Sequence, residues 1–421
     1  MRTAAAVALM AAGLLSACGP PTPRAAQAAT NSPDYARTLA DYNAAIASGE
    51  VSARGQMQSA LIPLELVDLY AERAMLTGGY DDYARAEALI ARLEAQFPPS
   101  DALCLAKARL HYALHRLGPA AKALDECPRL AGEPDALGLR ADIAFQSGRY
   151  REAGEIYRAL VNQVGTPQTY VQLALYSAKT GAPGEALAFL DAAEKRAHGA
   201  PPVRRSWFAL QRGIVELERG RLDEAAALFA LAAERLPGHW LNQEHIAEVA
   251  MLKGDVATAR PIYERVVREM GGPEYLDALG EIEAEAGRRQ AADQLFARAE
   301  AAYAERAKRF PEAIAGHALD HYLGAAPQPA RALALAEANY RNRANGDAAV
   351  GLAKAYLLNR RPRDATRLIE QHLARGWDTA ETHWILSVAA RAAGDEARAK
   401  AAAAEATRRN PLSQTQYAFA F

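Results

Sequence analysis

Small and apolar residues recur along most of this chain with a period close to 34 residues. An alanine follows each expected helix–helix turn, and these alanines lie 34, 33, 33, 39, 34, 33, 40, 33 and 34 residues apart. The two longer spacings allow either loop insertions or extended helices. The alanines are Ala86, Ala120, Ala153, Ala186, Ala225, Ala259, Ala292, Ala332, Ala365 and Ala399. The period predicts about ten antiparallel helix pairs over residues 58–411, because such periods are typical of repeat architectures.

Other positions keep the same register. Twelve residues before each alanine, nine of ten residues are Gly, Ala or Ser, and four residues after it all ten are apolar or aromatic. Gly213 and Phe229 are one such pair. We expect the small side chains of one hairpin to receive the bulky side chains of the next. Five residues before the alanine, six repeats have a glycine, which suits a turn that needs positive φ: Gly148, Gly181, Gly220, Gly254, Gly287 and Gly394.

This pattern resembles the tetratricopeptide repeat family. Its clearest copy runs from Ala209 to Pro237, with the family's positions occupied by Gly213, Gly220, Leu222, Ala225, Phe229, Ala232 and Pro237. The resemblance implies an all-α fold, an α-solenoid of antiparallel helix pairs wound into a right-handed superhelix. One helix pair cannot bury its apolar face alone, so neighbouring pairs must stack.

In this family the first helix of each pair lines a concave surface, where side chains are not needed for stacking and are free to bind. The family register therefore implies a groove that holds an extended peptide or a partner helix. The lining residues it implies are Arg109, Tyr112, Asp142, Phe145, Gln172, Leu175, Gln211, Ile214, Glu248 and Glu281. The family's clamp for a C-terminal carboxylate, which uses Lys, Asn and Arg, has no counterpart among these residues.

Both ends of the array need covers. Tyr35, Leu39, Tyr42 and Ile46 are spaced 4, 3 and 4 residues apart, which predicts a capping helix within residues 34–57. The tail over residues 412–421 is rich in aromatic residues. It either folds back on the last helix, which is the reading we prefer, or acts as a docking peptide.

The N-terminus has the features of an export signal. A short positive start is followed by a small and apolar run from Thr3 to Leu15, too short to span a bilayer of roughly 30 Å. Leu15-Ser16-Ala17-Cys18 then resembles the bacterial lipobox. The resemblance implies that residues 1–17 are a signal peptide and that Cys18 is lipidated, whereas the alternative is an ordinary signal peptide with an incidental cysteine.

The position after Cys18 bears on the compartment. It is Gly19 and not the Asp that retains known lipoproteins at the inner membrane, so the resemblance implies the inner leaflet of the outer membrane, facing the periplasm. Residues 18–33 are rich in Pro, Ala and Thr and form the expected tether. Acyl chains on Cys18 would anchor the protein stably, since each buried methylene is worth about 0.8 kcal/mol.

The two remaining cysteines fall in one repeat. Cys104 lies before a turn centred near Arg116, and Cys127 lies almost equally far after it. An antiparallel hairpin places them opposite each other, and a periplasmic location would allow a disulfide. The alternative is that both are reduced core residues, because other repeats have leucine or alanine at the Cys127 position.

Composition and motifs exclude several classes of function. The net charge of −1 gives no general attraction to nucleic acid, and three cysteines cannot build a four-thiolate metal site. Phosphate-binding loops, dinucleotide fingerprints and serine-hydrolase elbows are absent. Two i, i+4 histidine pairs, His317/His321 and His111/His115, have no evident third ligand. We therefore expect no catalytic residues, no metal and no cofactor.

Together these features predict a non-catalytic, lipid-anchored scaffold of the bacterial cell envelope. Its groove would hold envelope proteins or peptide segments, its lipid would hold the membrane, and nucleic acid would not be a partner. The alternatives are a metal-dependent or enzymatic module around His317 and His321, or a carrier of a small ligand.

Overall fold

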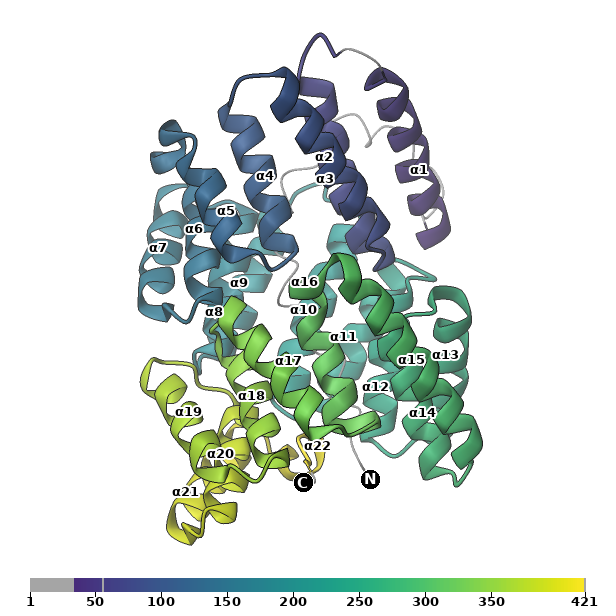
Figure 1. Cartoon of the computed structure of the whole chain (residues 1–421), viewed down its shortest axis with the longest axis vertical. Helices are drawn as coiled ribbons and strands as arrows, with labels where there is room; N and C mark the ends of the chain where they lie inside the picture. The colour runs from purple at the N-terminus through teal and green to yellow at the C-terminus, as the bar shows by residue number, and fades with distance from the viewer. Residues whose placement is uncertain (1–33, 55–56, 420–421) are drawn as a thin grey trace.

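The computed structural model describes residues 34–54 and 57–419, and all of its regular elements are helical (Figure 1). The signal peptide, Cys18 and the tether fall outside the described residues. The α-helices are α1 (Tyr35–Ser52), α2 (Leu61–Thr77), α3 (Asp81–Gln96), α4 (Asp101–Ala113), α5 (Leu117–Asp125), α6 (Pro134–Gln146), α7 (Tyr150–Gln163), α8 (Pro167–Lys179), α9 (Pro183–Arg196), α10 (Pro202–Glu218), α11 (Leu222–Arg235), α12 (Trp240–Leu252), α13 (Val256–Met270), α14 (Pro273–Glu285), α15 (Arg289–Arg309), α16 (Pro311–Asp320), α17 (Pro329–Asn342), α18 (Gly346–Leu358), α19 (Pro362–Ala374), α20 (Ala380–Ala392), α21 (Glu396–Arg409) and α22 (Ser413–Gln416). A 3-10 helix (Pro128–Gly132) follows α5, and a π-helical turn (His321–Ala325) extends α16.

Ten antiparallel pairs, from α2/α3 to α20/α21, form the predicted α-solenoid, so the fold class is confirmed. All ten register alanines lie in the second helix of a pair and have no exposed surface. The two longer spacings are extended helices: α10 has 17 residues and α15 has 21. The six predicted turn glycines all have positive φ, between 71° and 85°.

The small-to-large contact is real but joins a different pair of helices from the one predicted. A Cβ atom added to Gly213 on α10 would lie 2.4 Å from the ring of Phe229 on α11, and Gly280 on α14 has the same relation to Phe296 on α15. These two glycines therefore admit the bulky side chain of their own hairpin, which corrects the expectation of a contact with the next one. A contact of the predicted kind occurs between α7 and α8, where Gly154 admits the ring of Tyr176.

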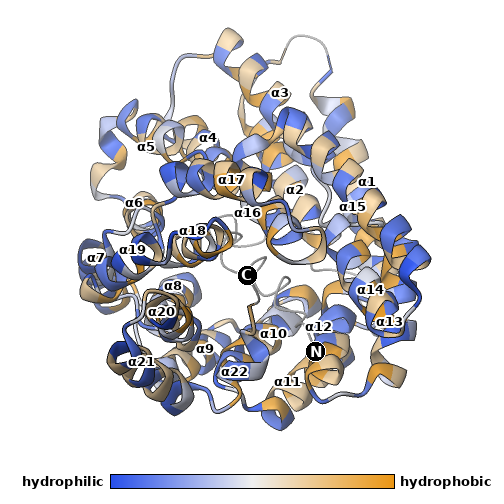
Figure 2. Cartoon of the chain, turned by 60° about the horizontal axis from the view of Figure 1, so that its bottom comes forward, coloured by the Kyte–Doolittle hydropathy of each residue, from blue (hydrophilic) through white to orange (hydrophobic). Residues whose placement is uncertain are grey.

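The solenoid winds into a superhelix whose second turn lies directly against its first. In Figure 1 the earlier pairs lie above the later ones. Figure 2, turned so that the bottom of Figure 1 comes forward, shows the helices arranged in a ring. Pairs α2/α3 to α10/α11 form what we call the first turn, and α14/α15 to α20/α21 the second. The rings of Tyr80 and Phe310 lie 5.4 Å apart across this junction, and the Tyr150 hydroxyl is 3.0 Å from Nδ1 of His372.

We call this turn-to-turn contact the seam. It joins the C-terminal ends of first helices in the first turn to the loops before α16, α18 and α20 and to the segment after α21. The Asp378 backbone N–H donates to the Lys179 carbonyl over 2.9 Å, and Asn410 Nδ2 donates to the Glu218 carbonyl over 3.1 Å. Pairs about five or six repeats apart in sequence are thereby packed together.

Both ends of the described chain are packed. On α1, Ile46 is buried against the first pair and Tyr42 donates a hydrogen bond to Glu72 on α2. At the other end, α22 contacts α20 and α21. Gln416 also donates to the carbonyl of Leu217 on α10, and Tyr417 is buried there. The tail therefore folds back, but it lies against the first turn as well as against the last pair. No helix among the described residues combines the length and apolar character that crossing a membrane requires.

Candidate functional site

The concave residues implied by the repeat register do converge, but in a narrow space. Seven of them line one central cavity of about 50 Å³: Tyr112, Asp142, Phe145, Gln172, Leu175, Gln211 and Ile214. The register is therefore a good guide to which side chains point inward.

The other three predicted residues lie elsewhere. Arg109 lines an open groove described below, and Glu248 lines a separate cavity of about 260 Å³ near α22. Glu281 lies close to Gly324 in the π-helical turn after α16. The ten residues are therefore divided among several spaces, although Asp142 and Gln172 border both the central cavity and the open groove.

The central cavity is closed by the second turn. Trp377, in the loop before α20, is 1% exposed, and its ring lies 5.5 Å from that of Phe145 and 5.3 Å from that of Tyr150. Tyr112, Gln211 and several other lining residues are consequently buried. We expected these side chains to be free of packing contacts, and that expectation is wrong, because they pack between the two turns.

Polar side chains inside the central cavity form hydrogen bonds with one another. Asp142 accepts hydrogen bonds from the Tyr157 hydroxyl at 2.7 Å and from Gln172 Nε2 at 2.9 Å. Burial, together with the Asp142 charge, raises the pKa of Tyr157 well above its usual value. At the seam, Lys179 lies 2.7 Å from Glu218 and 3.7 Å from Asp347. Burial alone would lower the pKa of this lysine, but the carboxylates outweigh that effect and raise it.

A second, larger space remains open at the other end of the same helices. It has a volume of about 790 Å³ and is lined by the N-terminal ends of α4, α6, α8 and α10 and by the loops before them. We call it the open groove. Leu105, Leu139 and Val164 give it apolar surface, whereas Arg109, which pairs with Asp135 at 2.8 Å, and Arg204 give it charge. This volume is within the range of ligand-binding sites.

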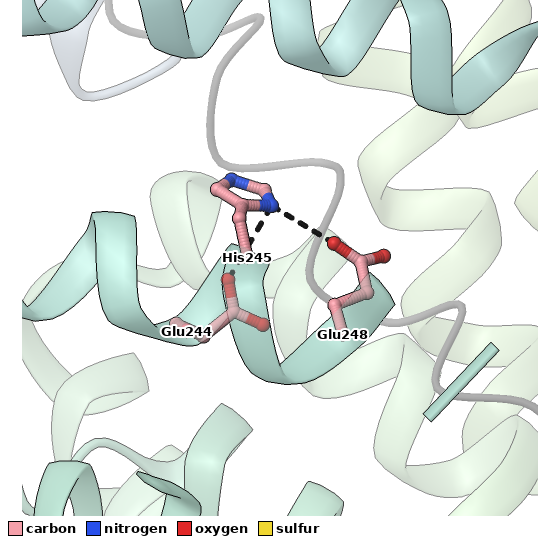
Figure 3. Close-up of side chains that lie close together, drawn as sticks. All are labelled: Glu244, His245 and Glu248. Atoms are coloured by element: carbon pink, nitrogen blue, oxygen red, sulfur yellow. Dashed lines mark hydrogen bonds and ion pairs between the residues drawn. The ribbon is translucent and has the colours of Figure 1, made fainter. Parts of the chain in front are cut away.

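Another cluster combines groups that can bind metal. Glu244, His245 and Glu248 lie on α12 with ligand atoms within 4.8 Å of one another, and all three are buried (Figure 3). Only Glu248 was identified from the sequence, as a groove residue. The signal that could have found the cluster is the spacing E-H-x-x-E, which places its members on adjoining positions of one helix.

The histidine pairs noted in the sequence make other contacts. His321 Nδ1 lies 2.8 Å from Asp277 Oδ1, and His317 Nδ1 lies 3.7 Å from Glu274. His115 instead faces Arg343 across the seam at 3.2 Å. Within the described residues, these histidines belong to no group of three potential metal ligands.

Cys104 on α4 and Cys127 before the 3-10 helix are joined by a disulfide, with their Cα atoms 6.3 Å apart. Both side chains are buried. Their neighbours Leu105 and Leu130 line the open groove. The disulfide therefore ties the start of one groove-lining helix to the loop that leads into the next.

No protein-family model and no curated protein matches the chain. Among solved structures, a chain of the APC/C hetero-tetramer Cut9–Hcn1 is similar at 16% identity over 91% of this chain and 72% of that chain, with a TM-score of 0.42. Yeast Tom70 is similar at 14% identity over 90% and 93%, with a TM-score of 0.43. MamA matches at 16% identity over 40% and 96%, with a TM-score of 0.32. At these identities the likeness concerns the fold alone.

Proposed function

We propose that this chain is a non-catalytic protein-binding scaffold, anchored by lipid at Cys18 in a bacterial envelope, that holds an extended segment of an envelope protein in the open groove. The observation that carries the proposal is the groove itself. It has about 790 Å³ of space, against about 50 Å³ in the central cavity. The proposed binding surface is therefore the N-terminal ends of the concave helices and not their whole length.

The lining of the open groove suits an extended peptide. Its lining combines the apolar side chains of Leu105, Leu139 and Val164 with charged side chains of both signs, which include Arg109, Arg204, Asp101, Glu133 and Asp135. Extended segments are bound by such surfaces through alternate side chains that enter apolar pockets, while charges at the rim set direction. The overall charge of −1 gives nucleic acid no corresponding advantage.

The location of the proposed scaffold rests on the N-terminal sequence. Leu15 to Cys18 resembles a lipobox, and Gly19 is compatible with transfer to the outer membrane. On this proposal the open groove faces the periplasm, at the end of a tether of about fifteen residues. Replacing Cys18 with Ser should release the protein from the membrane fraction without changing its fold.

A photo-cross-linking amino acid tests the groove in intact cells. At Ala102, which is exposed and lines the open groove, it should yield a discrete adduct with one envelope protein. The matched control is Arg151 on α7, exposed on a helix that does not line the groove. Adding Leu105→Arg to the Ala102 variant should abolish the adduct by filling the groove. Equal adducts from both positions, or an adduct that persists with Leu105→Arg, would refute the proposal.

A further inference from the structure

The cluster on α12 is buried at the junction of three helices. Glu244, His245 and Glu248 are 0%, 2% and 3% exposed. The His245 ring stacks on Phe229 of α11 with ring centres 4.9 Å apart, and Tyr263 of α13 donates a hydrogen bond to Glu244. Packing on both sides therefore holds the three side chains in place.

The three side chains converge on one point. His245 Nδ1 lies 2.8 Å from Glu248 Oε2 and 3.6 Å from Glu244 Oε2, and Figure 3 shows both carboxylates turned toward the same ring nitrogen. Two ligand atoms bound to one zinc ion at a tetrahedral angle lie about 3.4 Å apart, since each is about 2.1 Å from the metal. The observed separations bracket that value.

Protein groups leave one carboxylate oxygen of the cluster without a partner. Two buried carboxylates face one imidazole, and burying a carboxylate without compensation is costly. Glu244 Oε2 is the buried oxygen without a hydrogen-bond partner. An unsatisfied carboxylate oxygen aimed at two other donor atoms is the arrangement that a cation would complete.

We propose that Glu244, His245 and Glu248 form a binding site for one divalent transition-metal ion, with zinc as the best fit. One nitrogen and two carboxylate oxygens suit zinc, whereas calcium and magnesium prefer oxygen ligands alone. A water molecule would take the fourth position. Glu248 lines the cavity of about 260 Å³ near α22, which gives the ion a route from solvent.

The ion would be held by one helix that packs between two others, and the site is independent of peptide binding in the open groove. Glu244, His245 and Glu248 are on α12, and their packing partners are on α11 and α13. A bound ion would stabilise the middle of the solenoid between its two turns, because a ligand that binds only the folded state raises stability by mass action.

The chain offers a matched control. His321 and Asp277 form a similarly buried imidazole–carboxylate pair at 2.8 Å, but they belong to no group of three ligands in the described part of the chain. His321→Gln should therefore leave metal binding unchanged, whereas Glu244→Gln and Glu248→Gln should weaken it at least tenfold.

The experiment is a zinc titration of the full mature protein in detergent, after treatment with EDTA. We expect one zinc ion per chain, a rise of several degrees in Tm on zinc addition, and affinity at least tenfold weaker in Glu244→Gln and Glu248→Gln. Without metal, Glu244→Gln should have a Tm equal to or above that of the wild type, because it removes a buried carboxyl group whose Oε2 has no hydrogen-bond partner. That combination separates lost metal binding from lost folding.

Cobalt loading provides a readout that does not depend on variants. Co²⁺ in the wild-type protein should give the intense visible absorption of a four-coordinate site, and zinc should displace it. Absence of stoichiometric zinc binding, binding unaltered in both glutamate variants, or a cobalt spectrum like that of the free aqueous ion would each overturn the proposal.

Discussion

The two ends of the same concave helices differ in whether the second turn covers them. At their C-terminal ends, α6, α8 and α10 meet the second turn, and Phe145 is 8% exposed beneath Trp377. At their N-terminal ends the same helices border an open groove of about 790 Å³. The difference does not come from helix register, since both sets of side chains face inward. It comes from the position of the second turn along the superhelix axis.

The comparison shows that helix register and superhelical pitch determine different properties of the concave surface. Register determines which side chains face the axis. Superhelical pitch determines whether that space is empty, and pitch is expressed in contacts between residues about 200 positions apart, such as Gln146 with Asn345. A concave position in a tightly wound solenoid is therefore a binding candidate only where no later repeat covers it.

Trp377→Ala should have the largest effect on stability, and it should uncover the C-terminal ends of the concave helices. Truncating a fully buried tryptophan costs about 4 kcal/mol, because it leaves a cavity and removes the contacts with Phe145 and Tyr150. We expect urea unfolding to show that loss. Hydrogen exchange should also show faster exchange at the end of α6, as the seam loosens and the central cavity opens.

Trp384→Ala is the matched control for that change. Trp384 lies on α20 and is only half-buried, so the loss of stability should be smaller. Exchange at the end of α6 should remain as in the wild type. Unchanged protection there in Trp377→Ala would mean that the seam does not depend on this side chain.

Removal of the disulfide should have the next largest effect on stability, and it should act on the part of the molecule that borders the open groove. In the chain-entropy model, closing a loop of this length stabilises the folded state by about 3 kcal/mol. Cys104→Ser with Cys127→Ser should lose that amount and increase hydrogen exchange around Leu130, while the seam keeps its protection. Thiol counting on denatured, unreduced mature protein provides the direct check, and two reactive thiols would contradict the pairing.

An ionic contact within the second turn, next to the seam, predicts sensitivity to acid. Asp378 accepts from His383 Nε2 and from Arg409, each at 2.6 Å, and these hydrogen bonds hold its pKa far below the usual value. A lowered carboxyl pKa stabilises the fold fully above the unfolded value of about 3.9, and that contribution disappears as the pH falls below it. Asp378→Asn should cost about 2 kcal/mol at pH 7 and reduce the loss of stability in acid.

The control for Asp378 is an acidic group of similar exposure whose arginine partner is itself more exposed, with 43% of the Arg361 side chain accessible against 19% for Arg409. Asp364 pairs with Arg361 at 2.8 Å on the surface, where ion pairs contribute less than about 1 kcal/mol. Asp364→Asn should therefore change unfolding in urea little at either pH. Equal effects of the two substitutions would show that Asp378 contributes no more than a surface pair.

Much of the fold could be predicted from local sequence. The small-to-large pattern of Gly213 with Phe229 and the turn glycines act within about 35 residues, and they specify each hairpin. The seam could not be predicted in this way. Tyr80 with Phe310 and Gln146 with Asn345 are pairs without a common period or complementary charge, so no local pattern marks them.

The candidate site likewise has a part that local sequence predicts and a part that depends on tertiary structure. Seven predicted residues reach the central cavity because helix register alone determines their direction. The open groove depends on where Trp377 and α18 end the covered region, which is a tertiary property. The cluster around His245 could not be predicted, because only its burial distinguishes it from the surface of an ordinary charged helix. The pattern E-H-x-x-E does not indicate that burial.

The smallest predicted effect compares two turns that lack the usual glycine. His115 and Arg360 occupy the turn position of the second and ninth pairs, and both have positive φ, 59° and 57°. Such a conformation costs a non-glycine residue about 1–2 kcal/mol. Glycine removes that cost but adds freedom to the unfolded chain. Arg360→Gly, on the exposed surface, should therefore stabilise the protein by roughly 0.5 kcal/mol in urea unfolding.

His115 differs because it lies at the seam. Its Nε2 is 3.2 Å from Arg343, a buried guanidinium whose pKa is lowered by its surroundings. Replacing His115 with glycine gives the same backbone relief but leaves Arg343 without this contact, and an unsatisfied buried donor costs about 1–3 kcal/mol. His115→Gly should therefore be destabilising although Arg360→Gly is stabilising. If both substitutions stabilise equally, the contact between His115 and Arg343 does not contribute to holding the two turns together.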